Sequence, residues 1–408
     1  MANLSGSGGG SDDVLVIGGG VIGLSLAWRA SERGMAVTVL ERDTLGSGTS
    51  HVAAGMLAPV AEAEFGEAGR RVLELGLRSA ELWPAFAEQL RAASGVDVCL
   101  LRTGTLMLAR DEDEARELER QFAFREGLGL TTSRLRGSEA REREPALAPS
   151  MRLALEAPDD HSVDPRRLLA ALRAVCASSG VQLREHAPVE RVETDAGRVA
   201  GVTLAGGETL AAGQVVLAAG AWSAQIAGRE LGGRRVTITV PVRPVRGQLL
   251  RLRDPAGPGL LSRVIRFDGG YVVPRADGRY VLGATVEERG FDVEPDVGGV
   301  YDLLRDAHEI VPGISELKIE ELCVGLRPGM PDNAPAIGAA SPQGLTLATG
   351  HHRNGILLAP LTAQLVAKLL GGEEMDATEL ELLSACDPRR FVGASTETPG
   401  LAEAVLSR

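Results

Sequence analysis

Residues 14–41 read VLVIGGGVIGLSLAWRASERGMAVTVLE, and this stretch decides the fold. Its first apolar run enters a glycine turn in which Gly18, Gly20 and Gly23 have G-x-G-x-x-G spacing. A helical pattern and a second apolar run follow, and Glu41 closes the stretch. A strand, a glycine turn, a helix, a strand and a terminal acid in this order are typical of a βαβ unit that binds a dinucleotide.

Each position of this motif has a physical reason. Gly18 allows the tight turn, Gly20 lets the backbone approach the pyrophosphate, and Gly23 lets helix and strand pack closely. The helix N-terminus presents free N–H groups and about half a positive charge to the phosphates. Glu41 lies 18 residues after Gly23, where a carboxylate can accept the ribose hydroxyls. The unit therefore predicts a dinucleotide site, but it does not separate FAD from NAD.

Composition narrows the functional class. The chain has 408 residues and is 44% hydrophobic, which is enough for two or three domains with large cores. The net charge of −12 argues against a nucleic-acid surface. An anionic substrate would therefore need local arginines to overcome this background.

Compartment is indicated by the cysteines and by the absence of targeting signals. The four cysteines are far apart and form no C-x-x-C pair, which favours a reducing cytoplasm over a disulfide scaffold: Cys99, Cys176, Cys323 and Cys386. No apolar stretch approaches the ~18–20 residues of a membrane span. Residues 1–11 are rich in Gly and Ser and are expected to be a flexible leader. No metal-ligand spacing is recognisable.

Nucleotide-fold segments recur along the chain. Apolar runs at 215–220 and 344–349 read as buried strands, and a strand-rich block over 236–287 carries the hairpin signals Asp268-Gly269 and Asp277-Gly278. The pattern predicts an α/β chain of two interleaved domains with a ligand at their interface. We expect a nucleotide-binding domain over 12–90, 151–235 and 320–375, a substrate domain over 91–150 and 236–319 with a large antiparallel sheet, and a peripheral tail over 376–408.

Five segments together resemble the FAD-dependent D-amino-acid oxidase superfamily, most closely its glycine oxidases of thiamine biosynthesis (ThiO type). They are the 14–41 unit, Thr49-Ser50 with Ala53–Leu57, VVLAAGAW at 215–222, GLRPG at 325–329 and GHHRNGILLAP at 350–360. The last segment separates this group from NAD dehydrogenases, which have no reason to return a glycine turn and helix to the cofactor near the C-terminus. The resemblance implies a Rossmann-like FAD-binding domain interleaved with an α+β substrate domain.

The resemblance also implies which residues hold a non-covalent FAD. Pyrophosphate contacts would come from Val21 and Ile22, ribose contacts from Glu41 and Arg42, and adenine contacts from the Val189 backbone. The flavin side would be held by Thr49, Ser50, Ala54, Gly55 and Met56. The ribityl chain and the pyrimidine edge would be wrapped by His351, His352, Arg353, Asn354, Gly355, Ile356 and Leu357.

The residues of this last loop lead independently to a similar expectation. An apolar strand over 345–349 meets Gly350, and a helix begins near Gly355. If the flavin N1–C2=O edge lies before this helix, its N–H groups stabilise the anion that forms on reduction. The alternative is an ordinary strand–turn–helix capped by Asn354.

The implied activity is oxidation of glycine or another small amine. A hydride would pass from Cα to flavin N5, oxygen would become hydrogen peroxide, and the imine would hydrolyse to a 2-oxo acid and ammonia. Arg327, in GLRPG, is the expected carboxylate anchor, because its planar fork matches a carboxylate. Tyr271, Arg353 and Met56 are further implied pocket residues. Each of these residues also has an ordinary alternative. Arg327 could be a surface arginine and Tyr271 an aromatic residue packed on the sheet. Arg353 could only brace the FAD loop, and Met56 could fill the core.

Two positions depart from the family pattern, and a third raises the question of whether it attaches FAD. His352 stands where close relatives usually carry Tyr or Phe, and Val286 replaces a Met. Cys323 precedes GLRPG in a region where sarcosine oxidases attach FAD, but the surrounding motif differs, so a free core thiol is expected.

Competing functions remain open at this point. They are a D-amino-acid dehydrogenase, a sarcosine or secondary-amine oxidase, an RNA-linked flavin domain and a non-catalytic FAD-binding protein. The net charge opposes the RNA-linked domain. The expected partners are an amino-acid substrate and O2, without nucleic acid or membrane, and family members are often homo-oligomers.

Overall fold

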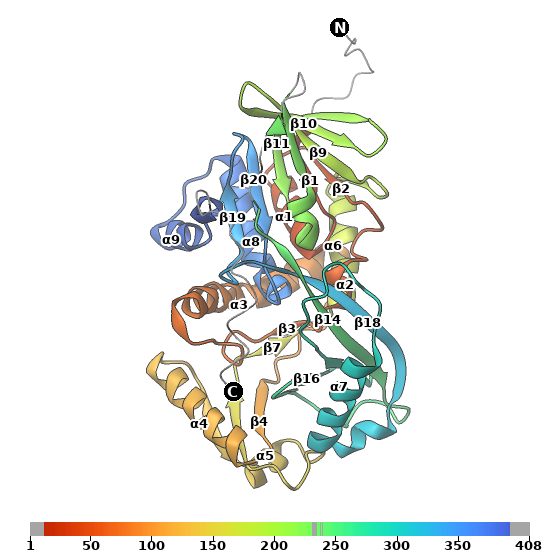
Figure 1. The fold of residues 1–408 in the computed structure, drawn as a ribbon, viewed down its shortest axis with the longest axis vertical. Helices are drawn as coiled ribbons and strands as arrows, with labels where there is room; N and C mark the ends of the chain where they lie inside the picture. The colour runs from red at the N-terminus through yellow and green to blue at the C-terminus, as the bar shows by residue number, and fades with distance from the viewer. Residues whose placement is uncertain (1–11, 231–234, 237, 239, 392–408) are drawn as a thin grey trace.

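The structure is a computed structural model that describes residues 12–391 except 231–234, 237 and 239. The expected leader and the end of the expected tail, 392–408, lie outside the described residues. Figure 1 shows two sheets stacked along the long axis, with the strands that include β1 and β11 at the top and those that include β4 and β16 at the bottom.

The upper sheet has ten strands around a parallel centre. The parallel order is β8-β2-β1-β11-β20, which the opening βαβ unit initiates. The bounds are β1 (Asp12–Ile17), β2 (Val37–Leu40), β8 (Gln182–Arg184), β11 (Thr209–Leu217) and β20 (Leu345–Thr349). The other members are β9 (Val189–Asp195), β10 (Arg198–Leu204), β12 (Ala227–Glu230), β13 (Arg235–Val236) and β19 (Ala336–Ala339).

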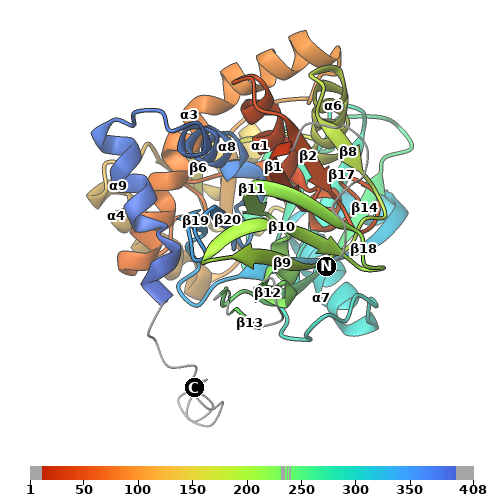
Figure 2. The same ribbon diagram turned by 90° about the horizontal axis from the view of Figure 1, so that it is seen from above.

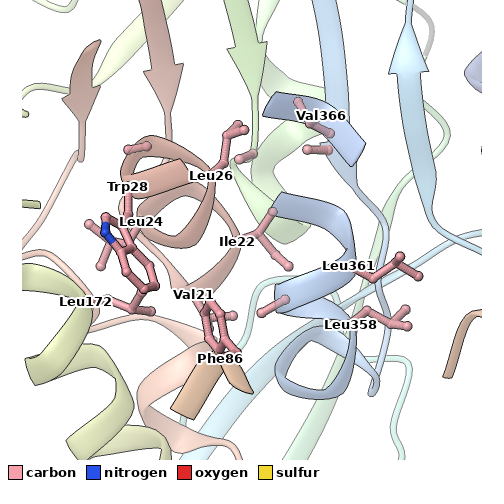
Figure 3. Close-up of a cluster of buried hydrophobic side chains, with 14 of the residues drawn as sticks. Val21, Ile22, Leu24, Leu26, Trp28, Phe86, Leu172, Leu358, Leu361 and Val366 are labelled. Atoms are coloured by element: carbon pink, nitrogen blue, oxygen red, sulfur yellow. The ribbon is translucent and has the colours of Figure 1, made fainter. Parts of the chain in front are cut away.

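Four helices pack on one side of this sheet. They are α1 (Val21–Ser31), α3 (Gly66–Ser94), α6 (Pro165–Ser178) and α8 (Gly355–Gly371), which gather along one edge of the view in Figure 2. Strand alternation explains the two cores, because Val14 and Val16 pack with the helices whereas Leu15 and Ile17 pack on the opposite face. Figure 3 shows Ile22 of α1 pointing toward α8 in the helix-side core.

The lower sheet has eight strands in the order β18-β14-β17-β16-β15-β4-β6-β5. All pairs are antiparallel except β15 with β4, so the expected large antiparallel sheet is mostly confirmed. The bounds are β4 (Thr105–Ala109), β5 (Ser133–Arg136), β6 (Leu153–Ala157), β14 (Arg243–Arg253), β15 (Val264–Phe267), β16 (Gly270–Pro274), β17 (Arg279–Gly283) and β18 (Lys318–Gly329). Three helices cover this sheet: α4 (Glu112–Gly127), α5 (Gly137–Arg143) and α7 (Val297–Ile310).

Short elements complete the described chain. A small two-stranded antiparallel sheet pairs β3 (Met56–Leu57) with β7 (His161–Ser162), and α2 (Thr49–Val52) precedes β3. The 3-10 turns are Gly220–Gln225, Pro312–Glu316 and Pro388–Phe391. No helix in the described ranges is long and apolar enough to cross a membrane.

Two expectations about the domain limits differ from the structure. Strands β6 and β18 pair with the eight-stranded sheet, although the sequence pattern places their residues largely in the nucleotide-binding domain. The expected peripheral tail also contains α9 (Ala377–Ala385), and Leu382 of this helix and its C-cap residue Cys386 are buried in the helix-side core. We propose that β6 and β18 be counted with the substrate domain and that α9 be counted with the FAD-binding domain.

Candidate functional site

One cavity of about 870 Å³ connects the glycine turn of the upper sheet with the face of the lower sheet. Gly18 and Gly20 line one end, and Tyr271 and Arg327 line the other. A cavity of this size lies in the upper range of cofactor sites. Its two ends belong to segments more than 200 residues apart in the chain, which the interleaved topology brings together.

The glycine turn has the shape that a pyrophosphate requires. Gly18 has φ +111°, and an added Cβ would stand 2.5 Å from the Ala218 carbonyl oxygen. At Gly23 a Cβ would collide with the Gly18 carbonyl oxygen, so this residue sets the packing of α1 on β1 and does not line the cavity. At Gly20 the nearest atom to such a Cβ is Ser50 Oγ at 3.2 Å. The turn therefore offers a backbone cradle that side chains would fill.

Glu41 shapes this turn as well as lining it. Its Oε2 accepts a hydrogen bond from the Gly19 N–H at 2.8 Å, and its Oε1 accepts one from the Asp43 N–H at 3.0 Å. The Arg42 guanidinium lies 3.7 Å from the centroid of the Trp222 ring. Val189 lines the same end of the cavity. This end has the residues expected for the adenosine half of a dinucleotide.

The segment around α2 connects the two halves of the site. Ser50 Oγ accepts a hydrogen bond from the Val21 N–H at 3.1 Å, at the start of α1. Thr49 Oγ1 donates to the Leu326 carbonyl at 2.7 Å, and the Ala54 carbonyl accepts from Arg275 at 2.6 Å. The expected flavin-side residues Thr49, Ser50, Ala54, Gly55 and Met56 all line the cavity.

The loop before α8 also reaches the cavity. Burial lowers the pKa of His351 to about 3, and its Nε2 lies 3.0 Å from Thr362 Oγ1. Burial together with nearby arginines lowers the pKa of His352 to about 4. Both imidazoles are therefore neutral near pH 7. The first residues of α8, Gly355 and Ile356, line the cavity with their free N–H groups at the helix start.

Two residues of this loop lie elsewhere. Asn354 is the N-cap residue of α8, as the alternative of an ordinary strand–turn–helix expects, although its side chain makes no capping hydrogen bond. The Leu357 carbonyl accepts hydrogen bonds from Ser79 and Trp83 of α3. Neither residue lines the main cavity.

Arg327 and Tyr271 lie flat on the same face of the lower sheet. The Arg327 guanidinium covers Gly247, where an added Cβ would collide with its Nη atoms. The Tyr271 hydroxyl would stand 2.6 Å from a Cβ at Gly283. Arg327 Nη1 donates to the carbonyls of Arg246 and Thr285 at 3.2 and 3.0 Å. Bare glycines therefore make room for both functional side chains.

The Tyr271 phenol is neutral at ordinary pH. Its burial raises its pKa, and the neighbouring Arg327 opposes this shift only in part. A neutral hydroxyl beside a guanidinium can donate to a bound carboxylate. The structure thus brings together the two residues that the sequence indicated for a carboxylate site.

Arg353 has a different environment from Arg327. It forms ion pairs with Glu64 and, at 3.9 Å, with Glu62. These carboxylates offset its charge, which favours the alternative in which Arg353 braces the loop. Val286, one of the departures from the family pattern, is 70% exposed at the cavity wall.

Sequence reasoning missed several charged residues of the cavity, among them Glu62 and Arg266. For Arg266 a signal existed, because the Asp268-Gly269 turn sets the register of its hairpin. That register places Arg266 directly opposite Tyr271. Glu62 lies between β3 and α3, and no pattern in the sequence marks it.

Cys323 is buried among apolar side chains and does not line the cavity. Its burial raises its pKa, which makes the thiol a poor nucleophile. Among the described residues no group of three His, Cys, Asp or Glu side chains is placed to hold a metal ion.

Comparison with known proteins agrees with this geometry. The chain is 39% identical over 365 residues to a glycine oxidase of Geobacillus kaustophilus, covering 89% of this chain and 93% of that protein. The crystal structure of the glycine oxidase from that organism superposes with a TM-score of 0.82 at 37% identity, covering 90% of this chain and 96% of the other.

Two further similar proteins are a longer bifunctional protein and an oxidase named for another substrate. A bifunctional ThiO/ThiG protein of Synechocystis is 35% identical over 96% of this chain, which corresponds to 56% of that longer protein. The crystal structure of an iminodiacetate oxidase from Chelativorans gives a TM-score of 0.79 at 28% identity, over 89% of this chain and 96% of the other. The family model for FAD-dependent oxidoreductases matches residues 13–369, so this chain belongs to the FAD-dependent oxidoreductase (DAO) family, with FAD as its cofactor.

Proposed function

We propose that this protein is a glycine oxidase-like flavoprotein oxidase that acts on glycine or another small amino acid or amine. The observation that carries the proposal is the pair Arg327 and Tyr271, which face the cavity from the lower sheet. The resemblance in sequence to glycine oxidases supports the same substrate class.

Arg327 anchors the substrate carboxylate in this proposal. Its two hydrogen bonds to backbone carbonyls fix the guanidinium over Gly247, so little side-chain entropy is lost when a carboxylate binds. The Tyr271 hydroxyl donates a second hydrogen bond to the carboxylate. With the carboxylate fixed at the sheet, Cα of a small amino acid points toward the centre of the cavity.

FAD, when bound, would supply the redox chemistry: the Cα hydrogen would leave as a hydride, the amine would lose a proton as the imine forms, and O2 would take up the two electrons and two protons as hydrogen peroxide. The chain contributes the N-terminus of α8, whose N–H groups face the cavity at Gly355 and Ile356 and favour negative charge there. We infer a non-covalent FAD, because Cys323 is buried away from the cavity.

The substrate amine must be neutral to release a hydride from Cα. His351 and His352 are both neutral at physiological pH because burial lowers their pKa values to about 3 and about 4. Neither histidine can then change the charge of the site between pH 5 and pH 9. We therefore expect kcat/KM to rise with pH as the free amine loses its proton.

Peroxide release from glycine, sarcosine and D-alanine tests the proposal with the purified holoenzyme. We expect turnover of at least one of these substrates with O2 as acceptor. Turnover with artificial electron acceptors but not with O2 would favour the dehydrogenase instead. A protein that binds FAD and turns over none of them with any acceptor would refute the proposal.

We also propose a cytoplasmic location, which the free thiols Cys99, Cys176, Cys323 and Cys386 support. The substrate and O2 are the proposed partners.

A further inference from the structure

Four arginines line the cavity, and they fall into two classes. Arg42 pairs with Asp43 at 3.0 Å, and Arg353 pairs with Glu62 and Glu64. Arg327 and Arg266 form no ion pair with any residue in the described part of the chain. In a chain of net charge −12, two cations without an ion-pair partner in one cavity favour an anionic ligand with two charged groups; Glu62, which also lines the cavity, forms its ion pair with Arg353 and with neither of these two.

The sheet register places these two cations in one row. Arg327 lies on β18, and its guanidinium covers Gly247 of β14. The next strands continue the row, because Gly283 of β17 pairs with Tyr271 of β16. Tyr271 in turn pairs with Arg266 of β15, which therefore points to the same face.

The spacing of this row suits a short diacid. β14 and β15 are three strand spacings apart, or about 14 Å, and the Arg327 side chain reaches from β18 across to β14. The Tyr271 hydroxyl lies over β17, between the two cations. A short chain with a carboxylate at each end can contact the guanidinium, the phenol and Arg266 together.

The alternative role for Arg266 is a structural brace, since it donates a hydrogen bond to the Ala61 carbonyl. That carbonyl already accepts a hydrogen bond from Arg125 at 3.0 Å. Arg125 is 1% exposed and lies outside the cavity, so it holds the same loop without presenting a charge to a ligand. A second arginine is therefore not needed for the brace.

We propose that Arg266 is a second anion-binding residue and that the cavity accepts an amine bearing two carboxylates, such as iminodiacetate. Arg327 and Tyr271 bind the carboxylate next to the oxidised carbon, and Arg266 binds the other. The proposal rests on the proposed amine oxidase function and adds its substrate class. A substrate with one carboxylate, such as glycine, leaves Arg266 without an anionic partner.

Sarcosine and iminodiacetate form a matched pair for the kinetic test, because they differ only by the second carboxylate. For the wild-type holoenzyme we expect kcat/KM for iminodiacetate to exceed that for sarcosine by about tenfold, as a charge-assisted hydrogen bond allows. Arg266→Gln keeps a donor for the Ala61 carbonyl and removes the charge, so it should abolish this preference. Arg266→Lys should retain most of it.

Arg125→Gln is the matched control, because it alters the brace on the same carbonyl and leaves the cavity charges unchanged. We expect it to change both substrates equally. If Arg266→Gln also changed both substrates equally, Arg266 would be a brace and the proposal would be wrong. Turnover of sarcosine without turnover of iminodiacetate by the wild type would also refute it, while leaving the amine oxidase function intact.

A binding test is independent of turnover. Diglycolate and methoxyacetate are ether counterparts of the two substrates and cannot be oxidised as amines. Isothermal titration calorimetry of the holoenzyme should give about tenfold tighter binding of diglycolate in the wild type and equal binding in Arg266→Gln. Equal binding of both ligands by the wild type would overturn the proposal even if the protein oxidised no amine.

Discussion

Two glycines of the lower sheet decide where the functional side chains lie. Gly247 and Gly283 each occupy a position at which a Cβ would meet the Arg327 guanidinium or the Tyr271 hydroxyl. Neither glycine has a positive φ, so both are required for space rather than for backbone conformation. At this scale the absence of a side chain is as informative about the site as Arg327 itself.

Gly247→Ala should therefore impair substrate binding without removing a charged group. The added methyl displaces the Arg327 guanidinium, and we expect KM for the amine substrate to rise about tenfold or more with a smaller change in kcat. Steady-state peroxide assays measure both parameters. Gly213→Ala is the control, since Gly213 also lies in a strand and a methyl added there would have no atom within 4 Å. An unchanged KM in Gly247→Ala would show that Arg327 is not held in this position during binding.

The buried residue Asp160 should make the free energy of unfolding depend on pH. Its carboxylate accepts hydrogen bonds from the Val60 and Ala61 N–H groups at 3.1 and 2.8 Å, and burial raises its pKa from 3.8 to about 7. Between these values the folded state binds more protons than the unfolded state. The contribution of Asp160 to stability is thus present below pH 3.8 and is lost as the pH rises through about 7, with a slope of at most about 1.4 kcal/mol per pH unit.

Asp160→Asn removes this titration. The free energy of unfolding of the variant, relative to the wild type, should improve on going from pH 5 to pH 8. Urea unfolding of both proteins at these two pH values measures the difference. The contribution of the histidines to the free energy of unfolding cancels in this difference, because both proteins contain the same histidines. A difference that is the same at both pH values would contradict the raised pKa of Asp160.

Individual elements were predicted well where their signals are local. Asp164 caps α6 by accepting the Arg166 N–H at 2.9 Å, and Pro165 opens the helix, which is an order of residues typical of a helix start. The Asp268-Gly269 turn closes the expected hairpin, with Phe267 paired to Gly270. Sheet membership was harder. The residues of β18 carry no information about which of the two sheets they join, since their partner β14 lies about 70 residues earlier.

In the site, too, residues within one contiguous motif were predicted, and residues brought in by contacts between distant segments were not. The cofactor residues of the glycine turn follow from one contiguous motif. Arg266 and Glu62 reach the cavity through sheet pairing and a loop path, which a single sequence does not specify. Residues that act through distant contacts were thus the ones missed.

The first glycine turn allows a prediction at the scale of the α1 element. Gly23→Ala places a methyl against the Gly18 carbonyl oxygen, backbone on backbone, so α1 must move away from β1. We expect a loss of several kcal/mol of stability, or no folded protein, because overpacking of a core contact of this kind is costly.

Gly20→Ala meets only Ser50 Oγ at 3.2 Å. It should fold normally and lose FAD affinity, because the methyl stands where the pyrophosphate approaches. Thermal melts and FAD titration separate the two outcomes, and equal effects of both variants would contradict these distinct roles.

For the molecule as a whole, two arginines of the lower sheet donate hydrogen bonds to the segment that we propose holds the flavin side of the cofactor. Arg251 donates to the His51 carbonyl at 2.8 Å, and Arg275 donates to the Ala54 carbonyl at 2.6 Å. Most residues of the segment 49–56 line the main cavity, whereas Arg251 lies on β14 and Arg275 directly follows β16 of the lower sheet. Cofactor binding and the substrate sheet should therefore be energetically coupled.

Arg275→Met tests this coupling, because Arg275 is buried and does not line the cavity. The substitution leaves the Ala54 carbonyl without its donor, at a cost of about 1–3 kcal/mol. We expect a lower Tm and about a tenfold higher Kd for FAD, measured by thermal melts and by titration of the apoprotein. Arg279→Met is the control, since Arg279 lies in the same sheet but pairs with Asp277 and Glu320 at the surface, where ion pairs contribute little. If Arg275→Met lowered Tm while the FAD affinity stayed at the wild-type value, the two halves would be joined without being coupled. A fall in both Tm and FAD affinity means that the lower sheet, besides binding the substrate, holds the cofactor segment in place.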